Sequence, residues 1–458
     1  MRFMKFGKAF MMSALSAGTI LGITSCVQSY TVGYLYVTGT TTAATGDNGI
    51  ISGFKIDHNK GNLTPINGLP ISSGGSNPVR AFLLTGGRFI YVLNRGVNSA
   101  GNDDCTLSDP CTGANITEFA IGGNGILTSQ GQDFFPQGKN SMRLIPDPNG
   151  NFLYVLDHDA PDNFASSYNP LTNACTLALG AGVETCGDIT AFKIDPNTGR
   201  LTLVVDAQVT SASGSPLSYF PVPSNPIDFV FGGSGFVLTM SGTPSTGNYV
   251  FPYSYNQSNG QLTINQNSSQ PVGAAQATAI VSAAGNIYVL DAEPLTYTPT
   301  MGSQTTVPSQ ILPFTVGTNG ALQQQAGGIV PGDAVLTKPI YMIEEAEGKW
   351  MYVAYEGDNN TSTGNPTSGI AGWVIDPQTR ELTPELTNSP WGSGSGPQCI
   401  LEDPSKQFIY TANFNDSTVT GRALNVQTGT LDPLPGNANK AYPLSGPATW
   451  CLYTGRTS

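Results

Sequence analysis

Short segments with alternating apolar and polar residues recur along the chain, and turns rich in Gly, Pro, Asn or Asp separate them. Alternation with a period of two is the pattern of a β-strand with one buried face, and these turn residues favour tight hairpins. The clearest unit consists of Phe152–Val155, then Ile189–Asp195, and then Gly199–Thr202. The sequence therefore predicts an all-β protein made of many short strands.

This three-part unit occurs seven times in the same order. A further apolar segment before each unit, such as Met142–Ile145 before the Asp147–Gly150 turn, adds a fourth strand. Seven repeated units of four antiparallel strands predict a seven-bladed β-propeller. Counted with this added strand, the second strand of the unit recurs at Tyr34–Val37, Phe89–Val92, Phe152–Val155, Gly235–Leu238, Asn286–Val289, Trp350–Val353 and Phe408–Thr411.

The two ends of the repeat array predict how the ring closes. The first unit begins at its second strand, near Gly33, and the chain ends in Gly446–Leu452, which resembles a first strand without its followers. We expect this last strand to complete the N-terminal blade, so that residues 33–458 form a single propeller. A solenoid is the structural alternative, but it exposes its ends and needs capping segments that the chain does not show.

Residues 1–25 have the pattern of an export signal. Arg2, Lys5 and Lys8 precede an apolar stretch, Ala9–Leu21, that is too short to cross a bilayer comfortably. The stretch ends in Ile23-Thr24-Ser25-Cys26, which resembles the lipobox of bacterial lipoproteins. We therefore expect a lipoprotein signal peptide over 1–25, lipidation of Cys26 and a tether over 26–32; the alternative is an ordinary signal peptide with a chance cysteine. Val27 in place of Asp favours the outer membrane, on its periplasmic or surface side.

Composition and charge narrow the classes of partner. Only 11% of the 458 residues are charged, the net charge is −12, and no cluster of Lys and Arg is visible. Nucleic acid is therefore excluded as a partner, because phosphate binding requires such a cluster. We expect a monomer that contacts the membrane only through its lipid anchor.

Six cysteines remain when Cys26 is set aside. An even number in an exported chain favours disulfides. Local loops would be closed by Cys105 with Cys111 and by Cys175 with Cys186, which leaves Cys399 and Cys451 to pair or to stay as buried thiols. Zinc is not expected, because no Cys-x-x-Cys motif occurs and the chain has only 2 His. We expect no metal and no cofactor, although calcium at the acidic loop residues is an alternative.

Candidate site residues come from the inner strands and from the long loops at one face. The long loops are 94–113, 157–187, 291–309 and 355–369. Function on rigid scaffolds concentrates on such loops and at a channel mouth. Counting seven residues back from each turn glycine aligns one position of the inner strands: Arg80, Arg143, Asp228, Thr278, Tyr341 and Cys399. The ends of the second strands add Asn94, Arg95, Asp157, His158, Asp291, Glu293, Glu356 and Asn413.

These residues suggest a chemistry. Arginines among carboxylates can hold a carboxylate, a sugar acid or a lactone, and a carboxylate near His158 could act as general base for attack by water. We take Arg80, Arg143, Asp157 and His158 as candidate catalytic residues and the others as candidate ligand-binding residues. In the alternative interpretation these side chains only pair with one another and with strand ends.

The repeats also resemble a known family. Tyr91–Asn94, Phe192–Asp195 followed by Gly199 and Leu201, Asp147–Val155, and Tyr410–Asn413 look like the seven-bladed propeller lactonases, which include a type of 6-phosphogluconolactonase. The resemblance covers nearly the whole mature chain and implies a lactonase-like propeller. The enzymes carry Pro-Arg-His motifs on inner strands, whereas the matching stretches here are Pro78-Val79-Arg80, Ser141-Met142-Arg143 and Pro397-Gln398-Cys399.

Two functions of different classes follow. The first is an exported carboxylic ester hydrolase that acts on a sugar lactone. The second is a non-enzymatic cell-envelope propeller that binds a protein or a glycan through the same loops.

Overall fold

The computed structural model describes residues 30–41, 48–84, 86–106, 108–161, 186–210, 214–233, 235–264, 269–299, 302–358, 367–436 and 441–455. Thr31–Ser458 forms one compact unit, which Met1–Tyr30 does not belong to. The predicted signal peptide and Cys26 lie outside the described residues. Within the described ranges, no helix is long and apolar enough to cross a membrane.

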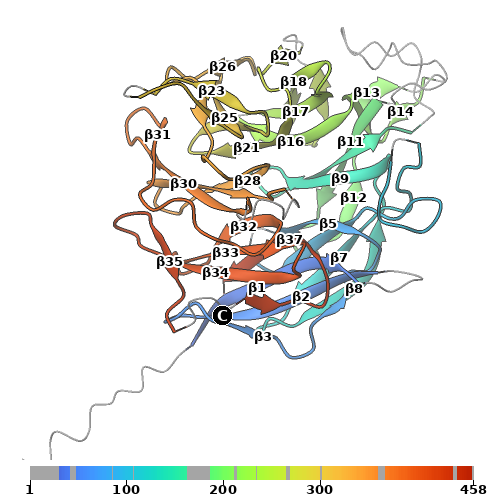
Figure 1. Ribbon diagram of the computed structural model, residues 1–458. Coiled ribbons are helices and arrows are strands. Elements are labelled where there is room, and N and C mark those ends of the chain that lie inside the picture. The colour runs from blue at the N-terminus through green and yellow to red at the C-terminus, as the bar shows by residue number, and fades with distance from the viewer. Residues whose placement is uncertain are drawn as a thin grey trace, which may run out of the picture. The chain divides into compact units, whose positions relative to one another are not determined.

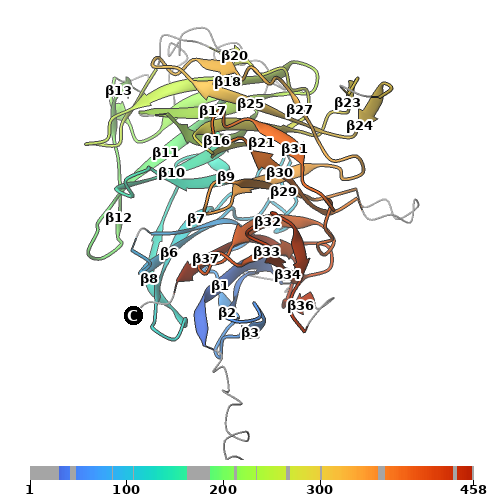
Figure 2. The same cartoon turned by 90° about the vertical axis from the view of Figure 1, so that its left-hand side faces the viewer.

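The unit Thr31–Ser458 contains seven antiparallel sheets, each with four main strands (Figures 1 and 2). The predicted all-β class and the seven-bladed propeller are therefore confirmed. The strands of the first four blades, from the inner strand outward, are β37 (Ala448–Gly455), β1 (Thr31–Thr40), β2 (Gly49–Asp57) and β3 (Leu63–Pro65); β5 (Pro78–Leu83), β6 (Phe89–Asn94), β7 (Asn115–Ile121) and β8 (Leu127–Phe134); β9 (Lys139–Pro146), β10 (Phe152–Asp159), β11 (Cys186–Ile194) and β12 (Leu201–Leu203); and β16 (Pro226–Gly232), β17 (Phe236–Thr243), β18 (Gly247–Tyr255) and β19 (Leu262–Ile264).

The last three blades follow the same plan. Their strands are β21 (Ala277–Ala283), β22 (Asn286–Asp291), β25 (Gln310–Val316) and β26 (Leu322–Gln324); β28 (Pro339–Glu344), β29 (Trp350–Tyr355), β30 (Gly369–Ile375) and β31 (Leu382–Glu385); and β32 (Pro397–Glu402), β33 (Phe408–Asn413), β34 (Thr418–Leu424) and β35 (Leu431–Pro433).

The outer edge of the blades is more elaborate than four strands. In five blades a short extra strand also pairs with the third strand, because the chain loops out after the fourth strand and returns. Two-stranded ribbons project from the third and fifth blades. The extra strands are β4 (Ile71–Ser72), β15 (Phe220–Ser224), β20 (Gln270–Pro271), β27 (Val330–Pro331) and β36 (Ala441–Pro443), and the ribbons are β13 (Asp206–Thr210) with β14 (Pro216–Leu217), and β23 (Leu295–Tyr297) with β24 (Thr305–Val307).

The ring closes as the sequence predicts. The C-terminal strand β37 pairs antiparallel with β1 from Gly33 to Gly39, so the N-terminal blade takes its inner strand from the other end of the chain (Figure 1). A disulfide between Cys399 on β32 and Cys451 on β37 then links the last blade to this closing strand. Closure removes two open sheet edges.

A repeated tyrosine joins neighbouring blades. In six blades a fully buried tyrosine of the second strand donates its hydroxyl hydrogen to a backbone carbonyl in the turn before the fourth strand of the next blade. The hydrogen bonds run from Tyr36 to Gly125, Tyr91 to Gly199, Tyr154 to Gly260, Tyr288 to Arg380, Tyr352 to Gly429 and Tyr410 to Gly61. The fourth blade has Leu238 at this position. The Tyr-Val and Gly-x-Leu motifs of the repeat are thus the two halves of one contact between blades.

We expect Tyr410→Phe to lower the free energy of unfolding by about 1–3 kcal/mol, because it leaves the Gly61 carbonyl without its buried donor. The bond joins the last blade to the first, with 2.6 Å between the hydroxyl and carbonyl oxygens. Urea unfolding measures the change, and Tyr453→Phe, at a 41% exposed tyrosine of β37, is the matched control. Equal stability of the two variants would contradict this role for the tyrosine.

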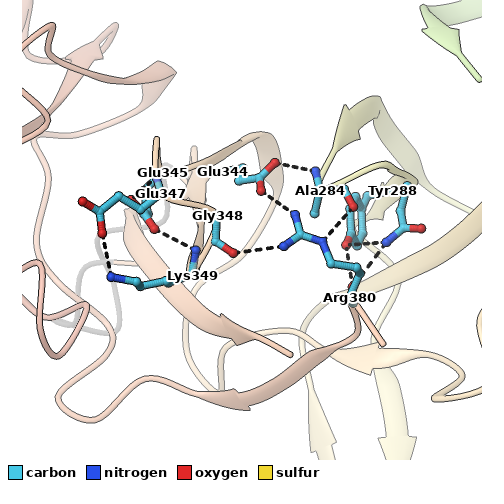
Figure 3. A network of polar contacts seen from close by, with 9 residues as sticks. Ala284, Tyr288, Glu344, Glu345, Glu347, Gly348, Lys349 and Arg380 are labelled. Carbon is cyan, nitrogen blue, oxygen red and sulfur yellow. Dashed lines mark hydrogen bonds and ion pairs between the residues drawn. The ribbon is translucent and has the colours of Figure 1, made fainter. Parts of the chain in front are cut away.

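The contact between the fifth and sixth blades is reinforced by charge (Figure 3). Arg380 has the positive φ of a turn glycine, 61°, and donates from Nη2 to Glu344 Oε1 over 2.6 Å. The other oxygen of Glu344 accepts from the backbone N–H of Ala284 over 2.6 Å. The Arg380 guanidinium also donates to the Ala284 and Gly348 carbonyls, at 3.2 Å each. This pair therefore ties the turns of two blades together on the face away from the long loops.

Candidate functional site

Every inner strand carries a β-bulge at an equivalent place near its start, where one extra residue interrupts the pairing with the second strand. A bulge re-aims the side chains that follow it. The residues directly after the bulge are Arg80, Arg143, Asp228, Ala279, Tyr341, Cys399 and Trp450.

This register corrects one sequence alignment. Counting from the turn glycine puts Thr278 in the set, but Thr278 is the bulge residue and Ala279 is the true equivalent. The turn of this blade consists of only Ala284 and Gly285, whereas the Asp147 turn of the third blade is longer, so the same count ends one residue too early.

A cavity of about 220 Å³ lies among the inner strands. It includes five of the seven residues that follow the bulges: Arg80, Arg143, Asp228, Tyr341 and Trp450. The remaining lining comes from residues nearer the hairpin turns, on three of the same strands and on β21 of the fifth blade: Ala81, Phe82, Leu144, Ile145, Pro146, Phe229, Val230, Ile280, Val281 and Ser282. The sequence thus places four of its candidate residues correctly together, and the fifth, Trp450, comes from the closing strand.

Arg80 is the second cation of this cavity, and the Asp228 carboxylate acts on it only through space. Its guanidinium carbon lies 3.7 Å from the centre of the Trp450 ring, within the range of a cation–π contact. Tyr341 meets the same indole edge-on, with 5.0 Å between ring centres. Among the described residues, Arg80 forms no ion pair. Burial first, and then the neighbouring Arg143, lowers the pKa of Arg80 to about 9, so the side chain is still charged at neutral pH.

Arg143 and Asp228 form the second part of the polar set. Arg143 Nε donates to Asp228 Oδ1 over 2.9 Å, and the aspartate side chain is only 6% exposed. The carboxylate also accepts from the backbone N–H groups of Phe229 and Ile280, at 2.9 and 3.2 Å. Asp228 is therefore held firmly in one orientation at the cavity wall, as a hydrogen-bond acceptor.

Asp157 lies in a separate cluster at the loop face, by which we mean the face that carries the long loops between second and third strands. It is fully buried directly opposite Asp188, which is also fully buried. Ser141 and Thr190 donate their hydroxyl hydrogens to Asp157, and the Gly138 N–H donates over 3.2 Å. Burial raises the pKa of Asp157 to about 7, and burial and the charge of Asp157 raise that of Asp188. The two carboxyls therefore share a proton at neutral pH.

His158 and Arg95 lie beside this cluster. His158 Nδ1 is 3.0 Å from Asp159 Oδ1, and Arg95 Nε donates to Asn140 Oδ1 over 2.6 Å. Burial and Arg143 lower the pKa of Arg95, while Asp159 opposes this shift. The Arg95 side chain therefore continues the positive potential of the arginine pair toward the loop face.

The remaining candidates are not gathered at one place, because each belongs to its own blade. Asn94, Asp291 and Asn413 are fully buried. Asp291 and Asn413 bond within their blades, for example Asp291 with Gln310 Nε2 at 2.8 Å, and Asn94 bonds to Thr117 of its own blade and to Ser73, which follows β4 of the first blade. Glu293 and Glu356 are half-buried at the loop face.

Two predicted disulfides are confirmed, Cys105–Cys111 and Cys399–Cys451. The predicted partner of Cys186, Cys175, lies outside the described residues. In the described ranges, no group of three or more His, Cys, Asp or Glu could hold a metal ion. Disulfides are typical of exported proteins.

Sequence reasoning missed Trp450 although it predicted the strand that carries it. The closing strand has no hairpin turn after it from which to count, and Pro447 stands one residue before the position of Pro78 in the structural register. The apolar residues of the cavity wall cannot be singled out from the sequence, since their alternation with the arginines is the ordinary pattern of a strand.

Comparison with known proteins agrees with the fold. No family model matches the sequence, and no curated protein matches it significantly. Among solved structures, a 6-phosphogluconolactonase candidate from Bacteroides fragilis is similar, with a TM-score of 0.61, 13% identity, and coverage of 92% of this chain and 98% of that one. The periplasmic gluconolactonase of Pseudomonas aeruginosa gives a TM-score of 0.60 at 15% identity, with coverage of 93% and 100%. These likenesses support a lactonase-like propeller fold.

Proposed function

We propose that the central cavity binds a small lactone and hydrolyses it to the hydroxy acid. One observation carries the proposal: the guanidinium of Arg80 lines a cavity and lies over Trp450, and among the described residues no carboxylate forms an ion pair with it at contact distance. A desolvated guanidinium without a counterion favours an anion or a developing oxyanion as its partner. Both arise in lactone hydrolysis, first as the tetrahedral intermediate and then as the product carboxylate.

In this proposal the three charged residues of the cavity each have one role. Asp228, which Arg143 holds in place over 2.9 Å, accepts a proton from water. The water oxygen bonds to the lactone carbonyl carbon, and the carbonyl oxygen takes up negative charge beside Arg80. The bond from that carbon to the ring oxygen then breaks, and the ring oxygen receives the proton that Asp228 holds. The carboxylic acid so formed releases its remaining proton to the solvent and pairs with Arg80 as a carboxylate. Asp157 and His158 receive no role, since their cluster lies outside the cavity lining.

We further infer that the protein works outside the cytoplasm, anchored by a lipid on Cys26 at the outer membrane. The apolar segment before Cys26 and the two disulfides support export. The proposed partner is a small lactone or sugar acid, and the protein is expected to act as a monomer without a cofactor.

Asp228→Asn tests the chemistry, because asparagine keeps the shape but cannot take the proton. We expect wild-type protein to acidify a solution of a small lactone faster than the uncatalysed reaction, and the variant to be about 100-fold slower. Asp432→Asn, at an exposed aspartate of β35, is the matched control. Tight binding of a lactone without turnover in the wild type would instead favour the non-enzymatic binding propeller.

A further inference from the structure

The cavity wall has two levels along the inner strands. Residues i and i+2 of a strand point to the same side, so Arg80 and Phe82 share a side, as do Arg143 with Ile145 and Asp228 with Val230. We call Arg80, Arg143 and Asp228 the polar tier and Phe82, Ile145 and Val230 the apolar tier. One two-residue step of a strand, about 7 Å, separates the tiers.

Both tiers face the cavity. Phe82, Ile145 and Val230 line it and keep part of their surface accessible, although each belongs to an inner strand. Val281 continues the apolar wall in the fifth blade, where it is 6% exposed. The partly accessible apolar side chains thus form a surface that water covers only at a free-energy cost.

We infer that the ligand is amphipathic: its lactone ring or carboxylate lies at the polar tier, and an aliphatic or aromatic substituent lies against the apolar tier. This inference rests on the proposed function and specifies its substrate class. An engineered apolar cavity of about 150 Å³ accepts a benzene ring. The cavity here, about 220 Å³, therefore has room for a small ring and a short apolar group.

A sugar lactone without such a group fits the apolar tier less well. Its hydroxyls would face Phe82, Ile145 and Val230, whose side chains offer neither donors nor acceptors, and an unpaired buried hydroxyl is unfavourable. The cavity wall thus distinguishes an alkyl-substituted lactone from a polyhydroxylated one.

The experiment compares γ-butyrolactone, γ-hexalactone and γ-octalactone with D-glucono-δ-lactone, using the full chain. We expect kcat/KM to rise about fourfold for each added methylene, the ratio that corresponds to about 0.8 kcal/mol of transfer free energy. Butyrate, hexanoate and octanoate are titrated in parallel while tryptophan fluorescence reports binding beside Trp450. Their affinities are expected to rise by the same factor per methylene.

Val230→Thr places a hydroxyl in the apolar tier with little change of shape. We expect this variant to reduce the gain per methylene to twofold or less in both series, whereas Val230→Ile retains it. Val335→Thr, at a valine that is 50% exposed, is the matched control and should leave both series unchanged.

The two series separate the two proposals. Turnover with no gain along the lactone series would overturn the amphipathic ligand and leave the hydrolase. A gain in carboxylate affinity without any lactone turnover would support the amphipathic ligand and overturn the hydrolase. Equal affinity of all three carboxylates, together with no turnover, would overturn both.

Discussion

Arg80→Met is expected to lower lactone turnover about 1,000-fold, the effect of removing a main stabiliser of the oxyanion. The same substitution should raise the free energy of unfolding by about 1 kcal/mol, because it replaces a desolvated charge by an apolar side chain of similar length. In the folded protein the Arg80 guanidinium has an indole 3.7 Å away and no ion-pair partner among the described residues. A charge that serves only the fold would have the opposite effect on stability.

The opposed changes in activity and stability make this variant informative. The rate of lactone hydrolysis is measured from the acid that it releases. The free energy of unfolding is measured with urea on the same preparations. Arg200→Met, at an exposed arginine in a hairpin turn of the third blade, is the control and should change neither. Loss of stability with turnover retained would mean that Arg80 supports the fold and that the ligand binds elsewhere.

Asp188→Asn is expected to reduce the pH dependence of the free energy of unfolding between pH 4 and 7 by the contribution of one bound proton. In the other blades, the residues that face each other at this point include amides, as in Asn94 with Asn115 and Asp291 with Gln310. Only the third blade opposes two carboxyls, Asp157 and Asp188. An amide at 188 would supply by itself the neutral partner that a shared proton now provides.

The direction follows from the raised pKa of both carboxyls. Asp157 and Asp188 are protonated more readily in the folded than in the unfolded chain, so their contribution to stability is complete below pH 3.8 and is lost as the pH rises through about 7. For one bound proton, the free energy of unfolding falls by about 1.4 kcal/mol per pH unit, or by about 4 kcal/mol over three pH units. Other buried acids, such as Glu118, add in the same direction.

Urea unfolding at pH 4, 6 and 8 measures this difference. The free energy of unfolding of Asp188→Asn should equal that of the wild type near pH 4 and exceed it at pH 8. Asp104→Asn, at an exposed aspartate in the loop after the second strand of the second blade, is the control. A wild-type stability that does not fall between pH 4 and 8 would show that the pair is not protonated in the folded state.

The fold can be predicted from the sequence because each strand and each turn of the repeat is recognisable from a few neighbouring residues. Each Tyr-Val strand and each Gly-x-Leu turn has the pattern of its own secondary structure, and seven copies in order leave few other topologies. The contact of Tyr410 with Gly61 shows why both motifs recur, since six of the seven blades make the same bond to the next blade. The extra outer strands follow irregular loops such as the one before β4, and no periodic pattern announces them.

The site could be predicted only in part. Arg80, Arg143, Asp228 and Tyr341 align by counting from hairpin glycines, so their convergence was accessible from the sequence. The bulges shift the register by one residue where a turn is shorter, which misplaced Thr278. Ring closure brings Trp450 to Arg80 across 370 residues of chain, and no local pattern encodes such a contact. The strand ends at Asn94, Asp291 and Asn413 are polar because these side chains hold the neighbouring loops. Their polarity therefore does not mark a ligand site.

The most direct test of the central claim is the rate at which the protein opens γ-hexalactone, followed by acid release at pH 7 beside the Arg80→Met variant. The account predicts turnover well above the uncatalysed rate in the wild type and a rate near background in the variant, with both proteins folded. No acid release above background by the wild type, or equal rates for the two proteins, would contradict it.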